Sequence, residues 1–314
     1  MLNDLLHLLL TQEFFHAMIR IATPILLAAI GEVILERSGV INLGMEGIML
    51  MGALFGVVGA SASGNTWIGL LTALVVGIIV SLIFGLSVIT LRSNQIVTGA
   101  AINIAALGLT SFLNRVIYGI RPLPVQINPL PPVEVPLLSK IPFIGQVFFN
   151  QDPLVYFAYF AIIISTFILF KTTWGLKIRA VGEHPRSADT VGISVNKWRY
   201  ICLAFNGMMC GIAGASLSLV QLNTFTDNMT TGRGFIAMAA VIFGRWNPIG
   251  ATIASLVFGG ASALQLRLQA FEIGISNQFL LMIPYLLTLI GVIIFRGQTS
   301  TPKALAKPYA KEQG

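Results

Sequence analysis

The chain has 314 residues, of which 55% are hydrophobic and 10% are charged, and its formal net charge is +7. Soluble domains contain about 25% charged residues and about 45–50% apolar residues, even when glycine is counted among the apolar ones. The composition therefore excludes a disordered chain, a disulfide scaffold and a nucleic-acid-binding domain, and it indicates an integral membrane protein embedded in a lipid bilayer.

Nine apolar segments are candidates for membrane-spanning helices, since a helix needs about 20 predominantly apolar residues to cross the hydrocarbon core. In chain order they are residues 14–35, 40–60, 66–91, 95–114, 154–170, 201–222, 234–243, 249–266 and 279–295. The segment 234–243 is the shortest, and it either spans the membrane or re-enters it. Eight or ten spans are the alternatives if one segment is re-entrant.

The loops predict how the chain is oriented. The loop 115–153 contains eight prolines, too many for a spanning helix, and only three basic residues. The segment 171–200 contains six basic residues, and the tail is also basic. Because Lys and Arg accumulate in cytoplasmic loops, we predict that 171–200 and the C-terminus are cytoplasmic, and that the loop 115–153 and the N-terminus lie outside. The predicted fold is an all-α polytopic transmembrane bundle in one domain, residues 1–300, with a cytoplasmic tail, residues 301–314.

Motifs for catalysis within this chain are absent from the sequence. There is no P-loop, no H-E-x-x-H, no G-x-S-x-G and no C-x-x-C motif. His7, His16 and His184 are far apart in the sequence, which does not favour a metal site. Residues 232–237 match a dinucleotide-binding fingerprint by letters, but that motif needs a preceding strand, so we interpret the match as chance. We predict no enzymatic activity, no cofactor and no metal.

The segment 36–53 is rich in glycine and joins two apolar runs. Asn42 and Glu46 are one helical turn apart and share a face, while Gly44 and Gly52 allow helices to approach closely. On one interpretation, Asn42 and Glu46 face a translocation path or fix the geometry beside it. On the other, Glu46 bonds to neighbouring backbone and Asn42 caps the second span.

Other side chains in or near the spans are candidates for a substrate path, because a buried amide is costly unless it is hydrogen-bonded. Helix–helix hydrogen bonding is the alternative role for the amides, and plain packing is the alternative for the aromatic rings. The full set of path candidates is Asn42, Glu46, Asn103, Asn206, Gln221, Asn223, Phe205 and Phe225.

The segment 175–197 is long for a simple connection. Pro185 is well placed to open a short helix that runs through Ala188 to Val191, and Gly192 is well placed to stop it. A short helix between two spans is suited to docking a soluble partner; the alternative is a solvated basic loop.

Two stretches carry a family resemblance. Residues 38–53 read Ser-Gly-Val-Ile-Asn-Leu-Gly-Met-Glu-Gly-Ile-Met-Leu-Met-Gly-Ala, and residues 179–193 read Arg-Ala-Val-Gly-Glu-His-Pro-Arg-Ser-Ala-Asp-Thr-Val-Gly-Ile. Together they resemble the bacterial ABC-transporter inner-membrane permeases that import simple sugars, nucleosides and branched-chain amino acids. The form of the first stretch is most similar to the nucleoside branch, and the resemblance covers roughly residues 14–296.

The resemblance implies that the second stretch is the cytoplasmic element that couples the permease to its ATPase. The residues to which the resemblance assigns this coupling role are Gly182, Glu183, Pro185, Ala188, Gly192 and Ile193. It also implies a multi-pass protein of the bacterial inner membrane that imports nucleosides by alternating access. The implied partners are a separate ATP-binding subunit, a second and related permease chain, and an extracellular substrate-binding lipoprotein. The alternatives are a sugar or branched-chain amino-acid permease, or an ion-coupled carrier that uses Glu32 and Glu46.

Overall fold

The computed structural model describes residues 11–120, 124–136, 138–270, 277–282, 284, 286, 290 and 301–310. Most of these residues are helical, so the chain is a polytopic helical membrane protein. Seven helices are long and apolar enough to cross a membrane. They are α2 (Gln12–Glu36), α3 (Met45–Ser63), α4 (Thr66–Gly85) with its π-helical extension Leu86–Thr90, α5 (Gln95–Tyr118), α7 (Pro153–Lys171), α10 (Val195–Ala215) with its π-helical extension Ser216–Gln221, and α12 (Pro248–Ala270).

These seven helices correspond to seven of the nine predicted spans. The predicted span 234–243 is helix α11 (Arg233–Phe243), which has 11 residues. At 1.5 Å per residue α11 is about 16 Å long, about half the thickness of the hydrocarbon core. The predicted span 279–295 lies largely outside the described residues. Nine spans therefore stay a prediction.

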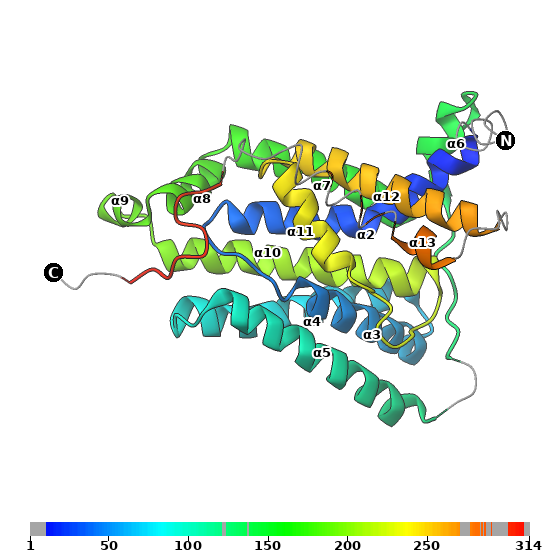
Figure 1. Ribbon diagram of the computed structural model, residues 1–314, viewed down its shortest axis with the longest axis horizontal. Coiled ribbons are helices and arrows are strands. Elements are labelled where there is room, and N and C mark those ends of the chain that lie inside the picture. The colour runs from blue at the N-terminus through cyan, green and yellow to red at the C-terminus, as the bar shows by residue number, and fades with distance from the viewer. Residues whose placement is uncertain are drawn as a thin grey trace.

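The shorter elements gather at the two ends of the bundle (Figure 1). At one end, the α9 end, lie α8 (Thr173–Glu183), α9 (Pro185–Thr190) and the strip 301–310. At the other, the α6 end, lie the start of α2 and the folded loop between α5 and α7. This loop contains the antiparallel pair β1 (Val133–Glu134) and β2 (Asn150–Gln151), the 3₁₀ turn Leu138–Lys140, and α6 (Ile144–Phe149). The short helix α13 (Asn277–Leu281) contacts α12.

Helices α2, α3 and α10 form the centre of the bundle. Helix α10 packs against α2, α3 and α4, while α12 packs against the other side of α2 (Figure 1). Helix α5 contacts α3 and leaves most of its surface exposed. This outer surface is apolar, as expected for a helix that faces lipid.

Glycine sets how closely the central helices approach, as the sequence predicted for Gly52. A Cβ atom on Gly52 would lie 2.5 Å from the carbonyl oxygen of Gly211 on α10. Where α4 crosses α10, a Cβ on Gly77 would lie 2.2 Å from the carbonyl oxygen of Gly207. Both distances are too short for any side chain. Small residues at these crossings let the backbones touch, which is how helices gain packing energy in a membrane.

Candidate functional site

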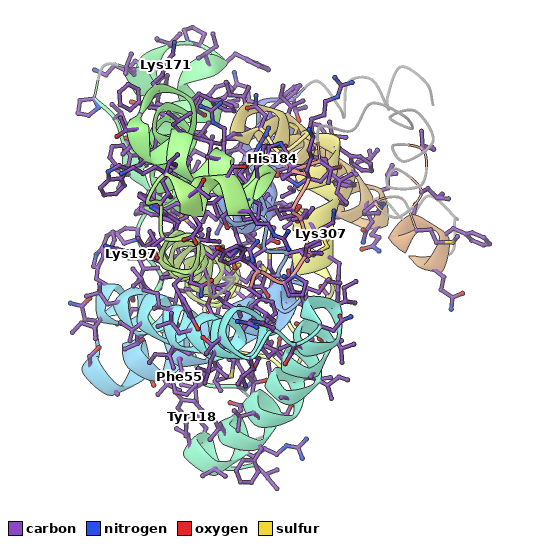
Figure 2. All side chains as sticks on the ribbon, turned by 90° about the vertical axis from the view of Figure 1, so that its left-hand side faces the viewer. Phe55, Tyr118, Lys171, His184, Lys197 and Lys307 are labelled. Atoms are coloured by element: carbon purple, nitrogen blue, oxygen red, sulfur yellow. The ribbon has the colours of Figure 1, made fainter. Side chains whose placement is uncertain are left out.

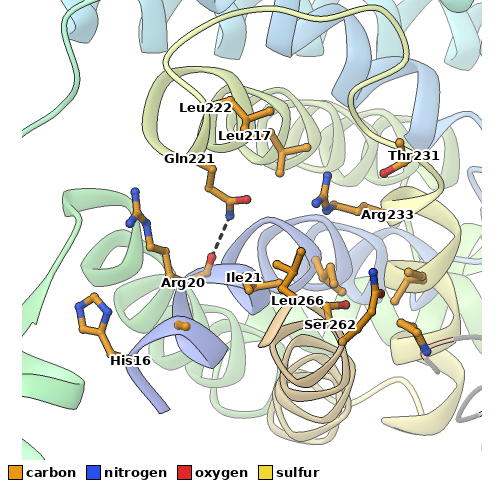
Figure 3. Close-up of a pocket in the computed structure, with 15 residues that line it drawn as sticks. His16, Arg20, Ile21, Leu217, Gln221, Leu222, Thr231, Arg233, Ser262 and Leu266 are labelled. Carbon is orange, nitrogen blue, oxygen red and sulfur yellow. Dashed lines mark hydrogen bonds between the residues drawn. The ribbon is translucent and has the colours of Figure 1, made fainter. Parts of the chain in front are cut away.

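A cavity of about 610 Å³ lies between α2, the π-helical end of α10, α11 and α12 (Figure 3). Its volume falls within the range of about 300–1,000 Å³ that is typical of small-molecule sites. Its walls combine apolar and polar side chains in similar numbers, and apolar atoms provide most of the lining surface. The apolar lining includes Ile21, Ile25, Leu217, Leu222, Ile236 and Leu266, and the polar lining is His16, Arg20, Gln221, Thr231, Arg233, Ser262 and Gln265.

Pro24 explains why Gln221 and Arg20 meet at this cavity. Proline has no N–H, so Pro24 leaves the carbonyl of Arg20, four residues earlier in α2, without its usual helical donor. The Gln221 side-chain amide donates to that carbonyl at 2.9 Å. In return, the Arg20 guanidinium donates to the carbonyl of Val220 at 2.9 Å. Two side-chain bonds to backbone thus connect the central helices beside the cavity, and Figure 3 shows the one from Gln221.

The start of α2 is also held by the segment that precedes α7. Arg20 forms a 2.9 Å ion pair with Asp152, and the His16 ring bonds to the carbonyl of Asn150 at 2.8 Å. Burial raises the pKa of Asp152, an effect that the positive charge of Arg20 opposes. The Arg20 side chain is 40% exposed, so part of the side chain stays open to a solute.

The N-terminus of α11 is fixed by Glu46. The two carboxylate oxygens of Glu46 accept hydrogen bonds from the N–H groups of Gly232, at 2.7 Å, and Gly234, at 2.6 Å. A carboxylate at a helix N-terminus satisfies free N–H groups and complements the helix dipole. Gly232 has φ +84°, and a Cβ on Gly234 would lie 2.7 Å from the backbone nitrogen of Glu46, so both positions require glycine. This contact accounts for the Gly-Arg-Gly sequence and places Arg233 at the cavity.

A second polar cluster is fully buried between α2 and α10. Glu32 accepts hydrogen bonds from the backbone N–H of Asn42 and from the side chain of Asn206, each at 2.8 Å. Asn42 in turn donates its side-chain amide to Asn206 at 2.8 Å. One turn further along α2, Glu36 accepts a hydrogen bond from the indole of Trp246. The cluster therefore joins α2 and α10 to the loop that precedes α3 and to the turn that follows α11.

The structure separates the eight predicted path residues. Gln221 lies in the wall of the cavity, whereas Asn42 and Asn206 belong to the buried cluster and Glu46 holds α11. Asn103 joins α5 to the start of α3, since it accepts from the N–H of Gly47 and donates to the carbonyl of Leu43, both at 2.8 Å. The bonds of Asn103 and Asn206 match the helix–helix hydrogen bonding considered as the alternative, and Glu46 bonds to backbone. Asn42 does not cap α3, whose N-cap is Gly44. Contact with substrate stays a prediction.

The remaining three predicted path residues do not line this cavity. Asn223 has φ +54° in the turn after α10, and its carbonyl accepts from the N–H of Ile127 at 3.0 Å. Phe225 is buried and lines a separate cavity of about 240 Å³ beside Tyr118. Phe205, a residue of α10, is half-buried and packs against the main hydrophobic core.

Sequence reasoning missed most of the polar cavity residues. Arg20 carried a usable signal, since it is a charge inside an apolar span that is followed four residues later by proline. Arg233 sits between two glycines, and that pattern was interpreted as a chance match. Ser262 and Gln265 are single polar residues in α12 and carry no local signal. Within the described ranges, no group of three His, Cys, Asp or Glu side chains could hold a metal ion.

The α9 end contains the predicted coupling residues (Figure 2). As predicted, Pro185 opens a short helix, which ends at Thr190, and Gly192 follows with φ +82°. Gly182 lies against the loop after α2, because a Cβ there would be 2.2 Å from the carbonyl oxygen of Arg37. Ala188 is buried and accepts the N–H of Ile193 at 3.0 Å. Glu183, Pro185 and Ile193 are half-exposed, and Gly192 is exposed.

Seven apolar helices with buried polar contacts, together with a solute-sized cavity between them, define a multi-pass membrane transport protein. The chain belongs to the family described as "Branched-chain amino acid transport system / permease component", which its residues 15–295 match.

Three relatives are similar over nearly their whole length. The guanosine ABC transporter permease protein NupQ of Bacillus subtilis is 42% identical over 306 residues, which cover 92% of this chain and 94% of the relative. The nucleoside ABC transporter permease protein NupC of Lactococcus lactis is 37% identical, with 93% and 95% covered. A putative glucose ABC transporter permease protein, TsgC13 of Haloferax volcanii, is 34% identical, with 95% and 97% covered.

Proposed function

We propose that this chain is the permease subunit of an ATP-driven importer of nucleosides, and that its cavity forms part of the translocation path. The observation that carries the proposal is the similarity to a guanosine and a nucleoside permease over more than nine-tenths of the chain. The composition of the cavity supports it. A nucleoside presents a flat aromatic base with polar edges and a ribose with hydroxyl groups, which suit a lining that combines apolar surface with amide, hydroxyl and guanidinium groups.

Sugars are the second candidate substrate, because the third relative is described as a putative glucose permease. A free sugar carries hydroxyl groups around its whole ring, and a site for it needs many hydrogen-bonding partners. The lining of the cavity is instead largely apolar. This difference favours nucleosides over sugars.

ATP hydrolysis would take place in a separate ATP-binding subunit, on which α8 and α9 dock. The similarity of this chain to NupP, a second guanosine permease protein of Bacillus subtilis, at 27% identity, supports a pair of different permease chains. A substrate-binding lipoprotein outside the cell would deliver the nucleoside. ATP can drive alternating access only if the partner binds the inward-open and outward-open states with different affinities.

An uptake assay with competitors tests which substrate the transporter carries. Cells that lack their own nucleoside transport would express the chain with the other subunits of its system, and they would be given radiolabelled guanosine with unlabelled nucleosides, glucose or leucine as competitors. We expect nucleosides to compete and glucose and leucine to have no effect, with uptake lost when the ATP-binding subunit is inactive. Competition by glucose or leucine instead of nucleosides would refute the proposed substrate.

For the topology we propose about nine spans, with the N-terminus and the loop 115–153 outside, and with the segment 171–200 and the tail 301–314 in the cytoplasm. Both native cysteines, Cys202 and Cys210, are buried, so they should give little background labelling. Lys140→Cys and Ser187→Cys would place single thiols at exposed positions at the two ends. We expect a membrane-impermeant thiol reagent to label Lys140→Cys in intact cells, and Ser187→Cys only after the cells are opened. The reverse pattern would overturn this topology.

A further inference from the structure

The strip of residues 301–310, called here the tail strip, packs on the α9 end of the bundle (Figure 1). The N–H of Ala304 donates to the carbonyl of Gly182, the next-to-last residue of α8, at 2.9 Å. On its other side the strip touches the loop after α2, since a Cβ on Gly39 would lie 3.2 Å from the carbonyl oxygen of Ala304. The strip is therefore in contact with the predicted coupling segment itself.

Tyr309 anchors the far end of the tail strip. Its side chain is 9% exposed and packs with Val181 of α8, Ala188 of α9 and Val195 of α10. Burial raises the pKa of the Tyr309 hydroxyl, and so does its hydrogen bond to the carboxylate of Asp189. The coupling helix α9 is thus held by an aromatic residue from outside the coupling segment.

Arg199 holds the middle of the tail strip. Its side chain is only 1% exposed, although it carries a positive charge. It donates to the carbonyl of Ser38 at 3.3 Å and to the carbonyl of Lys307 at 3.4 Å. A buried cation needs such acceptors to offset its desolvation. Arg199 therefore joins α10, the loop after α2 and the tail strip in one assembly.

Between the tail strip and α9 lies a cleft of about 570 Å³. Arg186 on one wall and Lys303 and Lys307 on the other bring three cationic side chains to it, while Glu183 is the one carboxylate among its described lining residues. Figure 2 shows His184 and Lys307, which both line the cleft, on the face that looks out from this end of the molecule. The cleft is therefore a mainly cationic site of the size of several side chains.

We propose that this cleft receives an acidic segment of the ATP-binding subunit, so that the docking site is formed jointly by α8, α9 and the tail strip. The inference rests on the proposed function, because it assumes that this end meets that subunit. The occupant is chosen by charge complementarity and by position. Figure 1 shows α9 projecting beyond the ends of the neighbouring helices, which places the cleft away from the lipid-facing flanks of the bundle. Complementary charges at such a surface speed association and select the partner.

The test compares charge reversals on the same face. The double variant Lys303→Glu/Lys307→Glu reverses two exposed charges in the cleft. The control, Lys171→Glu/Lys197→Glu, makes the same change at two exposed positions that do not line it. Each permease would be purified in nanodiscs of neutral lipid together with its second permease chain. Binding of the ATP-binding subunit would be measured at low and high salt. We expect binding by the cleft variant to be about tenfold weaker or more at low salt, with a smaller salt dependence, and binding by the control to be nearly unchanged.

Two further variants test whether the position of the tail strip matters for binding, independently of its charges. Tyr309→Ala should release the strip and weaken binding, whereas Tyr309→Phe keeps the ring in its pocket and should bind nearly as the unmodified chain does. Equal binding by the cleft variant and the control would overturn the composite site while leaving the proposed function intact. An effect of charge reversal that appears only in nanodiscs of anionic lipid would assign the cleft to lipid headgroups and overturn it too. Failure of the unmodified permease to bind the subunit would refute both proposals.

Discussion

Helices α2 and α5 are alike in length and mean hydropathy and opposite in environment. They have 25 and 24 residues and nearly the same hydropathy, yet 83% of the apolar part of α2 is buried and only 17% of that of α5. Hydropathy does not distinguish them, because lipid tails are about as apolar as the side chains of neighbouring helices. The difference lies in the polar residues. In α2, Arg20, Glu32 and Glu36 all have partners on other elements. Helix α5 instead bonds to α3 and to the loop before it through uncharged side chains, those of Gln95, Asn103 and Tyr118.

The largest effect expected from this comparison comes from the two asparagines. Asn206→Leu would remove one of the two donors to the buried carboxylate of Glu32 and the acceptor of the Asn42 side-chain amide, which should cost about 2–4 kcal/mol of stability. Asn103→Leu affects two half-buried backbone groups and should cost about 1–2 kcal/mol. Denaturation in detergent, with the amount of protein in the membrane measured alongside, would check both values. Equal losses of stability in the two variants would mean that the central helices and α5 are equally sensitive to the loss of a buried amide.

Glycine substitutions should produce the next largest difference. Gly52→Ala forces a methyl group against the backbone of Gly211 and should cost about 1–3 kcal/mol. Gly108→Ala on α5 meets no atom within 4 Å and should stabilise the helix by up to about 1 kcal/mol. The two melting temperatures should therefore shift in opposite directions. A loss of stability in Gly108→Ala would show that α5 has a packed neighbour on that face.

The smallest effect expected is on transport through the cavity. Gln221→Leu removes both a possible substrate contact and the donor to the Arg20 carbonyl. Pro24→Ala restores a backbone N–H for that carbonyl, so the double variant Pro24→Ala/Gln221→Leu should recover stability. We expect severalfold weaker uptake, measured as KM at matched membrane abundance, in both Gln221→Leu and the double variant. Full recovery of uptake in the double variant would make Gln221 a structural residue only.

The sequence predicted where the helices lie along the chain, but it did not predict which side chains meet between them. The apolar runs predicted the seven long helices, and Pro185 and Gly192 predicted the short helix α9, because these features depend on local chain properties. The predicted coupling and substrate roles stay predictions. The cavity was beyond reach, because His16, Gln221, Arg233 and Gln265 are brought together by contacts between distant parts of the chain. The role of Glu46 is similar: its spacing from Asn42 suggested a shared face, whereas its partners lie 186 and 188 residues away.

The contact between the tail strip and α8 also bears on the order in which the transporter is assembled. Residues 301–310 are synthesised after every described helix that they touch, so during translation the cleft has only the wall that α8 and α9 provide. If the cleft binds the ATP-binding subunit as proposed, a chain still attached to the ribosome would insert its helices before the docking site is complete. Recruitment of the ATPase would then follow completion of the permease, and incomplete chains would not capture a subunit that hydrolyses ATP.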